Sequence, residues 1–425
     1  MGLDRAQDSG KHHGHKKQPK RQFLVNHREK LKPGYIIESQ LCKYEVIELL
    51  GSGGFGDVYR VKDSSKKIYA VKTEYHKDSV DRKLLRLKIE CEILKLATEV
   101  SDPKLKSHFV PFYDSGRFNE MRFMVMALVG PSIFDLRKKI PSAEFSKDAA
   151  WRIAVETLEG IADLHGIGYI HRDIKPANFA IGVDENRSTI YLLDFGISRK
   201  FLTPEGEHKP PREKTKFVGT VGFASRRCHE GVEQSRKDDL ETWCYMVIDL
   251  CDHQNFPWKH LRDKDQVYPI KCELFKCSPK NKALKKVFKN FHQVMKYIDE
   301  LAFSQTPDYY VIRQQMDDIA KESKLDQDPN WPKMKNNDKK PAASDEDVEE
   351  SDGESESDKK KHHKKRTGSD SGKKHKEGGG GARNASGRSG KKSQRSKKGK
   401  SPKKKGSTTN TKVGPLSTVK TRIFQ

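Results

Sequence analysis

The stretch HRDIKPAN, residues 171–178, decides the fold and the chemistry expected of this chain. Asp173 offers a carboxylate that can accept or orient the proton of a hydroxyl group, and Lys175 offers a cation for a transferring phosphoryl group. Asn178 adds an amide oxygen suited to a divalent cation. The alternative is a chance run of polar residues in a loop, and the motifs on either side count against it.

Two apolar segments follow this loop. NFAIG (178–182) and TIYLLD (189–194) are expected to pair as strands around the polar turn VDENRS, and they place the Asp-Phe-Gly aspartate, Asp194, shortly after Asp173. A carboxylate at a strand end is a suitable oxygen ligand for Mg²⁺. Phosphoryl transfer needs mainly positioning and charge neutralisation, which these residues supply. Together they predict nucleotide-dependent phosphoryl transfer.

A glycine-rich turn lies near the other end of the domain. YEVIELL (44–50) and DVYRV (57–61) are typical of strands, and GSGGFG (51–56) between them lets backbone N–H groups approach a polyphosphate. An ordinary hairpin is the alternative, whereas a dinucleotide-binding turn would need a helix directly after the glycines. The residues expected to contact the nucleotide here are Gly51, Ser52, Gly53, Gly54, Phe55, Gly56 and Val58.

Lys72 lies inside the apolar strand IYAVKTE, residues 68–74. A lysine in such a strand commonly faces water, but here it is also the expected cation for the nucleotide phosphates, with a helix glutamate beside it. Residues 81–97 have a helical apolar period, and Glu90 lies beside the inward face. Glu92 is the competing candidate.

With these motifs in this order, the chain resembles the casein kinase 1 family of Ser/Thr protein kinases over roughly residues 40–320. The segments LVGPSIFDL (128–136), HRDIKPANFAIG, LLDFGISRKF and VEQSRKDDLE (232–241) carry this resemblance, and HKPPR followed by FVGT is closest to the tau-tubulin kinase branch. The resemblance implies an α+β bilobal kinase fold with a small β-rich N-lobe and a mainly helical C-lobe. It also implies ATP and Mg²⁺ as cofactors and protein serine or threonine as the acceptor.

The resemblance assigns further roles by position. Thr220 is expected to link the substrate-binding loop, residues 220–227, to Asp173 and Lys175. Asp239 is expected to steady the catalytic loop, residues 171–178. Lys175, in place of an Ala-Arg pair, indicates Ser/Thr acceptors. Asn178 and Asp194 are the expected metal ligands. The remaining positions expected around ATP are Ala70, Lys72, Met126, Ala127, Leu128 and Val129.

The segment GTVGFASRRCHEG (219–231) lacks the Ala-Pro-Glu tripeptide that usually ends a kinase activation segment. The casein kinase 1 family, which the chain resembles, lacks this tripeptide too. Gly222 stands where casein kinases 1 carry an arginine that binds phospho-primed substrates, and Arg172 is a candidate receiver for a phosphorylated Thr215. An anion site from neighbouring cations is one interpretation, and a solvated basic face is the other. The cations in question are Lys209, Arg212, Lys214, Lys216, Arg226 and Arg227.

Composition divides the chain into a folded part and tails. Of 425 residues, 33% are hydrophobic and 34% are charged, which is poor for a chain folded throughout. Nine acids crowd residues 344–358, and twenty Lys or Arg crowd residues 359–405, so most of the net charge of +24 belongs to the tails. The predicted divisions are a basic flexible segment (1–40), a kinase domain (41–325, with the N-lobe about 41–127 and the C-lobe about 128–325) and a disordered tail (326–425).

The basic tail supports a second hypothesis, binding of a polyanion or of the cytoskeleton by a kinase-fold scaffold. KKKHHKKR also resembles a nuclear-import signal, while a tail that folds back on the acidic block is the alternative. Ser351, Ser355 and Ser357, which lie among acids, are candidate sites of self-phosphorylation. Seven cysteines without metal-site spacing indicate reduced thiols, no structural metal and a cytoplasmic or nuclear protein, and no membrane span is expected. The expected partners are protein substrates with acidic or phospho-primed recognition sites.

Overall fold

The computed structural model of the chain describes residues 29–326 except 54–55, 76–85, 103–106 and 279–280. The predicted tail with its acidic and basic blocks, and Gly54 and Phe55 of the glycine-rich turn, lie outside the described residues. In the described part, no helix is both long enough and apolar enough to span a membrane.

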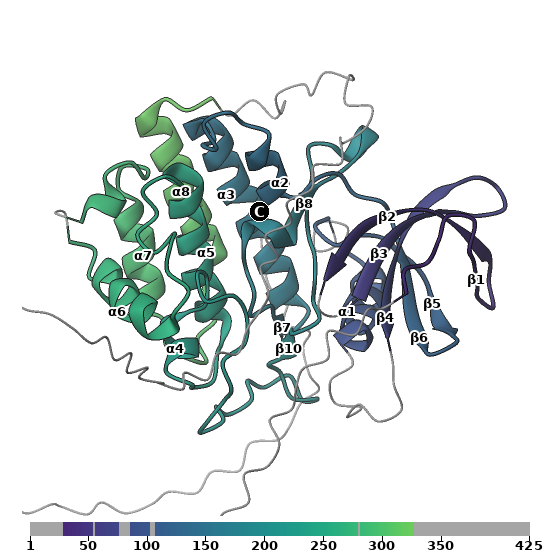
Figure 1. Cartoon of the computed structure of the whole chain (residues 1–425). Helices are drawn as coiled ribbons and strands as arrows, with labels where there is room; N and C mark the ends of the chain where they lie inside the picture. The colour runs from purple at the N-terminus through teal and green to yellow at the C-terminus, as the bar shows by residue number, and fades with distance from the viewer. Residues whose placement is uncertain (1–28, 54–55, 76–85, 103–106, 279–280, 327–425) are drawn as a thin grey trace, which may run out of the picture. The chain divides into compact units, whose positions relative to one another are not determined.

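Six antiparallel strands of the described residues form one sheet, in the order β1-β2-β3-β4-β6-β5 (Figure 1). We call this sheet and helix α1 the N-lobe. The elements are β1 (Ile36–Glu38), β2 (Lys43–Gly53), β3 (Gly56–Lys62), β4 (Ile68–Tyr75), α1 (Arg86–Glu99), β5 (Phe112–Phe118) and β6 (Met121–Met126).

Side chains alternate along β3, as expected of a strand with one buried face. Tyr59 and Val61 are buried and join Val71 and Phe123 in the core of the sheet. The strands of the glycine-rich turn and the Lys72 strand lie where the sequence predicts them. The sheet, however, begins before residue 41: β1 pairs with β2 and buries Ile37, so the end of the segment predicted to be flexible is part of the fold.

The rest of the described chain, which we call the C-lobe, is mainly helical (Figure 1). The helices are α2 (Ile133–Lys138), α3 (Lys147–Gly166), α4 (Arg226–His229), α5 (Arg236–Cys251), α6 (Lys264–Phe275), α7 (Phe291–Glu300) and α8 (Tyr309–Ser323). The short strands are β7 (Tyr169–Ile170), β8 (Phe179–Ile181), β9 (Ile190–Leu192) and β10 (Arg199–Lys200). This β-rich and helical division confirms the predicted α+β fold class.

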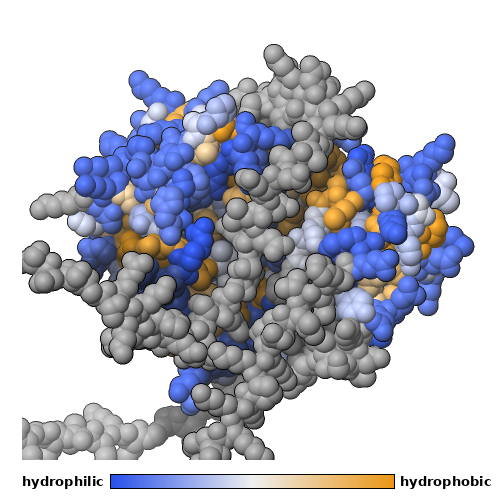
Figure 2. Space-filling view, viewed as in Figure 1, coloured by the Kyte–Doolittle hydropathy of each residue, from blue (hydrophilic) through white to orange (hydrophobic). Residues whose placement is uncertain are grey.

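Helix α5 is the buried centre of the C-lobe. Its segment LETWCYMVIDL (240–250) is apolar nearly all round, which predicts burial on every side, and Trp243 and Tyr245 are fully buried. Trp243 Nε1 donates to Ala154 O at 3.0 Å, which joins α5 to α3. By contrast, hydrophilic residues cover much of the visible helical surface (Figure 2).

Candidate active site

The catalytic loop follows β7 and is fixed by an aspartate of the first turn of α5. Asp239 accepts from the backbone N–H of His171 at 2.6 Å and from that of Arg172 at 2.8 Å, and His165 Nε2 lies 2.9 Å away. Burial acts to raise the pKa of Asp239, but its contacts with His165 and His171 lower it below the usual value. A buried carboxylate therefore holds the loop that carries Asp173.

Asp173, Lys175 and Thr220 form a closed triangle. Thr220 Oγ1 donates to Asp173 Oδ1 at 2.9 Å and accepts from Lys175 Nζ at 2.8 Å, while Nζ lies 3.0 Å from Asp173 Oδ2. Gly219 makes the close approach possible: its φ is +92°, and a Cβ there would lie 2.5 Å from Arg172 O. The substrate-binding loop and the catalytic loop therefore meet at the predicted base.

Asn178 and Asp194 lie beside this triangle. Asn178 Nδ2 donates to Asp173 O at 2.8 Å, which fixes the amide next to the base. Asp194, with φ at +62°, follows β9, and its side chain is 50% exposed. A half-exposed carboxylate and a neighbouring amide form a donor set that fits Mg²⁺, which prefers oxygen ligands.

Lys72 connects the N-lobe to this site. Its Nζ donates to Glu90 Oε1 at 2.7 Å and to Asp194 Oδ1 at 3.0 Å. Burial disfavours the ammonium, but the two carboxylates outweigh it and raise the pKa of Lys72, so the lysine stays charged. Glu92, the competing candidate, instead accepts from Tyr169 OH at 2.6 Å.

The other positions expected around ATP lie on the sheet next to Lys72 and on the segment after it. Ala70 pairs with Met126 across β4 and β6, and Val58 pairs with Lys72 across β3 and β4. Ala127 N donates to Pro111 O at 2.9 Å; Leu128 and Val129 follow it. At the glycine-rich turn Gly51 pairs with Val58, Ser52 with Asp57 and Gly53 with Gly56.

The structure adds a residue to this site that the sequence did not predict. Lys30 Nζ donates to Ser52 Oγ at 2.6 Å and to Asp57 Oδ1 at 2.6 Å, one on each strand of the glycine-rich turn. The Asp57 side chain is only 6% exposed, so its ion pair with Lys30 is partly shielded from solvent. Lys30 thereby joins the segment before β1 to the predicted phosphate-binding turn.

We expect Lys30→Met to raise the KM for ATP about 3-fold, because a partly buried ion pair that orders the turn contributes roughly 0.5–1 kcal/mol. Steady-state kinetics with ATP varied at saturating protein substrate measure this. Lys43→Met is the matched control, since Lys43 pairs with Glu38 on the exposed surface. A rise of equal size in both variants contradicts a specific role for Lys30.

The cations predicted to form one anion site contact different partners in the structure. Arg226 directs its guanidinium into α5 and α7, where it pairs with Glu241 at 3.1 Å and with Asp299. Arg227 Nε donates to Glu233 O at 3.2 Å, and Lys209 Nζ donates to Lys200 O at 3.0 Å. Lys214 and Lys216 are exposed.

A compact basic group remains around one acid. Glu233, which is buried, pairs with Arg212 and lies 3.3 Å from Arg199. Burial and then the positive charges of Arg199 and Arg212 lower the pKa of Arg172 to about 10. Thr215, the candidate phosphorylation site, donates from Oγ1 to Val232 O at 3.0 Å. Arg199 and Arg212 thus share one carboxylate beside the catalytic loop, whereas Arg172 Nε donates to Ile197 O at 2.7 Å.

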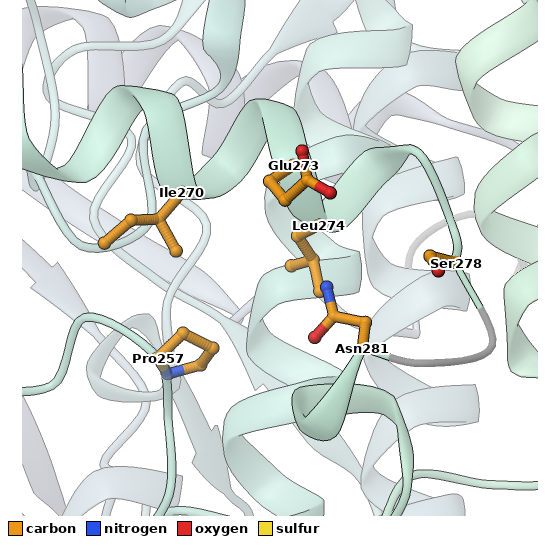
Figure 3. Close-up of a pocket in the computed structure, with 6 residues that line it drawn as sticks. All are labelled: Pro257, Ile270, Glu273, Leu274, Ser278 and Asn281. Atoms are coloured by element: carbon orange, nitrogen blue, oxygen red, sulfur yellow. The ribbon is translucent and has the colours of Figure 1, made fainter.

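A pocket of about 310 Å³ lies outside this site. Figure 3 shows its lining, which comes from α6, from Pro257 before it and from the segment after it. None of the residues predicted for ATP, metal or base lines it. The lining residues are Pro257, Ile270, Glu273, Leu274, Ser278 and Asn281.

Comparisons with known proteins give a family match. A family model described as "Protein kinase domain" matches residues 44–329. A Caenorhabditis elegans protein provisionally named a serine/threonine-protein kinase is 38% identical over 61% of this chain and 76% of its own length. The serine/threonine-protein kinase spe-6 of the same organism is 34% identical over 65% and 72%, and a protein provisionally named casein kinase I is 31% identical over 62% and 75%.

Proposed function

The chain belongs to the protein kinase family and is an ATP-dependent serine/threonine kinase, and on that premise we propose that it is a casein kinase 1-type enzyme that works with Mg²⁺. The similarity to a protein provisionally named casein kinase I and the segment at 232–241 support this placement. HKPPR followed by FVGT supports the tau-tubulin kinase branch.

The triangle of Asp173, Lys175 and Thr220 carries the conclusion. Asp173 is positioned to accept the proton of a substrate hydroxyl, and Lys175 to neutralise charge on the transferring phosphoryl group. Lys72, held charged by Glu90, is available to the nucleotide phosphates. Asn178 and Asp194 would hold Mg²⁺, which when bound neutralises phosphate charge.

Transfer of radiolabelled phosphate from ATP to casein, followed by phosphoamino-acid analysis, tests this function. Phosphoserine and phosphothreonine are the expected products, and phosphotyrosine as the main product would overturn the proposal. After chelation, Mg²⁺ should restore the activity whereas Ca²⁺ should not, because Ca²⁺ prefers a larger and more flexible ligand set. Equal restoration by both ions contradicts the metal assignment.

The proposed substrates are proteins with acidic or phosphorylated residues near the acceptor. The support is electrostatic: Arg199 and Arg212 share the carboxylate of Glu233, and their positive charges also act on Arg172 of the catalytic loop. Guanidinium groups suit phosphate because they donate in pairs.

We expect Gly222→Arg to raise the preference for a phospho-primed peptide about 10-fold, since it adds one guanidinium to the substrate-binding loop. The site has room, because a Cβ at Gly222 would meet only the Trp258 ring, at 3.9 Å. The ratio of kcat/KM for paired peptides with and without an upstream phosphoserine measures the preference. Gly222→Ala is the control for the backbone change, and an equal ratio in the two variants contradicts the prediction.

The basic tail, residues 359–405, supports a second proposed role, contact with polyanions, and the proposed location is the cytoplasm, the nucleus or both. Removal of residues 344–425 tests this role through localisation and through salt-dependent binding to a polyanion such as heparin. Unchanged localisation and unchanged binding would discard it.

We propose no structural metal. His108, Glu156 and Glu159 bring their ligand atoms within 4.8 Å of one another. Each of the three already has a partner of opposite charge: Asp163 lies 2.7 Å from His108 Nδ1, Arg152 lies 3.6 Å from Glu156, and Arg313 pairs with Glu159. Metal analysis of the purified protein checks this: stoichiometric zinc would contradict it.

A further inference from the structure

Lys271 of α6 is a lysine with 0% exposure whose Nζ forms no ion pair with any residue that the structure describes. Instead Nζ donates to Val221 O at 2.8 Å and to Ala224 O at 2.6 Å, both in the substrate-binding loop. His229 Nε2 lies 3.3 Å away. The amine therefore reaches from α6 into the loop that carries Thr220.

A second side chain binds the same loop from the same side. Trp258 Nε1 donates to Gly222 O at 2.7 Å, and Lys271 Nζ lies 5.3 Å from the centre of the Trp258 ring. The carbonyls of residues 221, 222 and 224 are thus all bound by Lys271 or Trp258, which together we call the loop clamp.

The loop clamp acts on a turn that begins at Thr220. Thr220 O accepts from Phe223 N at 2.9 Å and from Ala224 N at 2.8 Å. A shift of the carbonyls on the far side of this turn therefore moves Thr220, whose hydroxyl lies between Asp173 and Lys175.

Stability alone gives little reason for an amine here. A buried lysine without a carboxylate partner loses its hydration, and burial lowers the pKa of Lys271 to about 7. An apolar side chain of the same length would avoid that loss but would leave two loop carbonyls without a donor. What the amine provides is a fixed position for the loop.

We propose that Lys271 is a positioning residue for phosphoryl transfer, which through the loop clamp keeps Thr220 in contact with Asp173 and Lys175. It acts on the acceptor side of the reaction, because its contacts lie in the substrate-binding loop, whereas the residues expected around ATP lie on the sheet, on the segment after it and at Asn178 and Asp194.

Lys271→Met tests the proposal, because methionine keeps the length and removes the donor. We expect kcat/KM for a protein substrate to fall about 10-fold, while the KM for ATP changes less than 2-fold and the protein stays folded at the assay temperature. Lys276→Met is the matched control: Lys276 ends the same helix but pairs with Glu273 on the exposed surface, and its kinetics should be unchanged.

Unchanged kcat/KM in a folded Lys271→Met protein would overturn the proposal. So would a loss of ATP affinity as large as the loss in kcat/KM, because a merely structural lysine would affect both substrates alike. If this variant does not fold, Trp258→Phe decides, since it retains a ring but removes the donor to Gly222 O. A fall of about 3-fold in kcat/KM with unchanged KM for ATP supports the loop clamp, and no fall overturns it.

Discussion

Asp194→Ala should reduce phosphoryl transfer to casein by about 10³-fold or more, because it removes an expected metal ligand and one of the two carboxylates at Lys72. Since the Asp194 side chain is 50% exposed, its removal should leave the fold intact. Incorporation of radiolabel under initial-rate conditions measures the loss.

Glu185→Ala is the matched control, because Glu185 is an exposed acid in the turn between β8 and β9. It should retain full activity. Equal incorporation by the Asp194→Ala protein and the unmodified protein would mean that Asp194 has no part in the transfer.

Asp239→Asn should lower both stability and rate. Asp239 is 1% exposed, and its two carboxylate oxygens accept hydrogen bonds from two backbone N–H groups of the catalytic loop. Loss of a buried, fully bonded carboxylate costs about 3 kcal/mol of unfolding free energy, and a displaced loop costs roughly 10² in kcat. Thermal melting and initial rates measure the two effects.

The same variant has a predicted pH signature. Because the pKa of Asp239 is below its unfolded value of 3.8, the unfolded chain takes up a proton first as the pH falls. The stabilisation is therefore complete at neutral pH and is lost on acidification through the usual aspartate range and below. Asp239→Asn should lack this acid-dependent step, whereas Asp265→Asn, an exposed first-turn acid of α6, should keep it. Identical acid profiles in all three proteins contradict the assignment.

The sequence predicts the elements whose pattern is local. Alternation in β3 and the apolar stripe of α1 follow from side-chain period alone, and the order of glycine turn, Lys72 strand and HRDIKPAN loop identifies the family-level fold. The same reasoning placed Glu90 beside the inward face, and the structure brings it to Lys72.

The roles of Lys30 and Lys271 could not be predicted, because they depend on contacts that are distant in the sequence. A lysine in a basic segment or on a helix is normally a solvated charge, and only contacts with distant residues bury it. Lys30 contacts Asp57 because β1, which follows Lys30, pairs with β2, and β2 pairs with β3. Lys271 contacts a loop about 50 residues earlier in the chain. No periodic signal marks either position.

The charge pattern of the sequence also could not show which partner each arginine contacts. Arg226 and Arg227 are neighbours in sequence, yet Arg226 pairs with Glu241 of α5, while Arg227 donates to the carbonyl of Glu233 and lies 4.0 Å from Asp238. The acids that pair with Arg226 lie in elements that come later in the chain, so their proximity depends on tertiary packing. Of the six cations predicted to form the anion site, only Arg212 pairs with the Glu233 carboxylate, beside Arg199, which the prediction did not include.

The strand β1 has a consequence for the solubility of the domain. It covers the outer side of β2, and without it the backbone donors and acceptors of Lys43, Tyr44 and Glu45 would form an open edge. An open edge of this kind recruits strands from other molecules. A domain cut at residue 41 would therefore be prone to self-association even though every catalytic side chain remained in place.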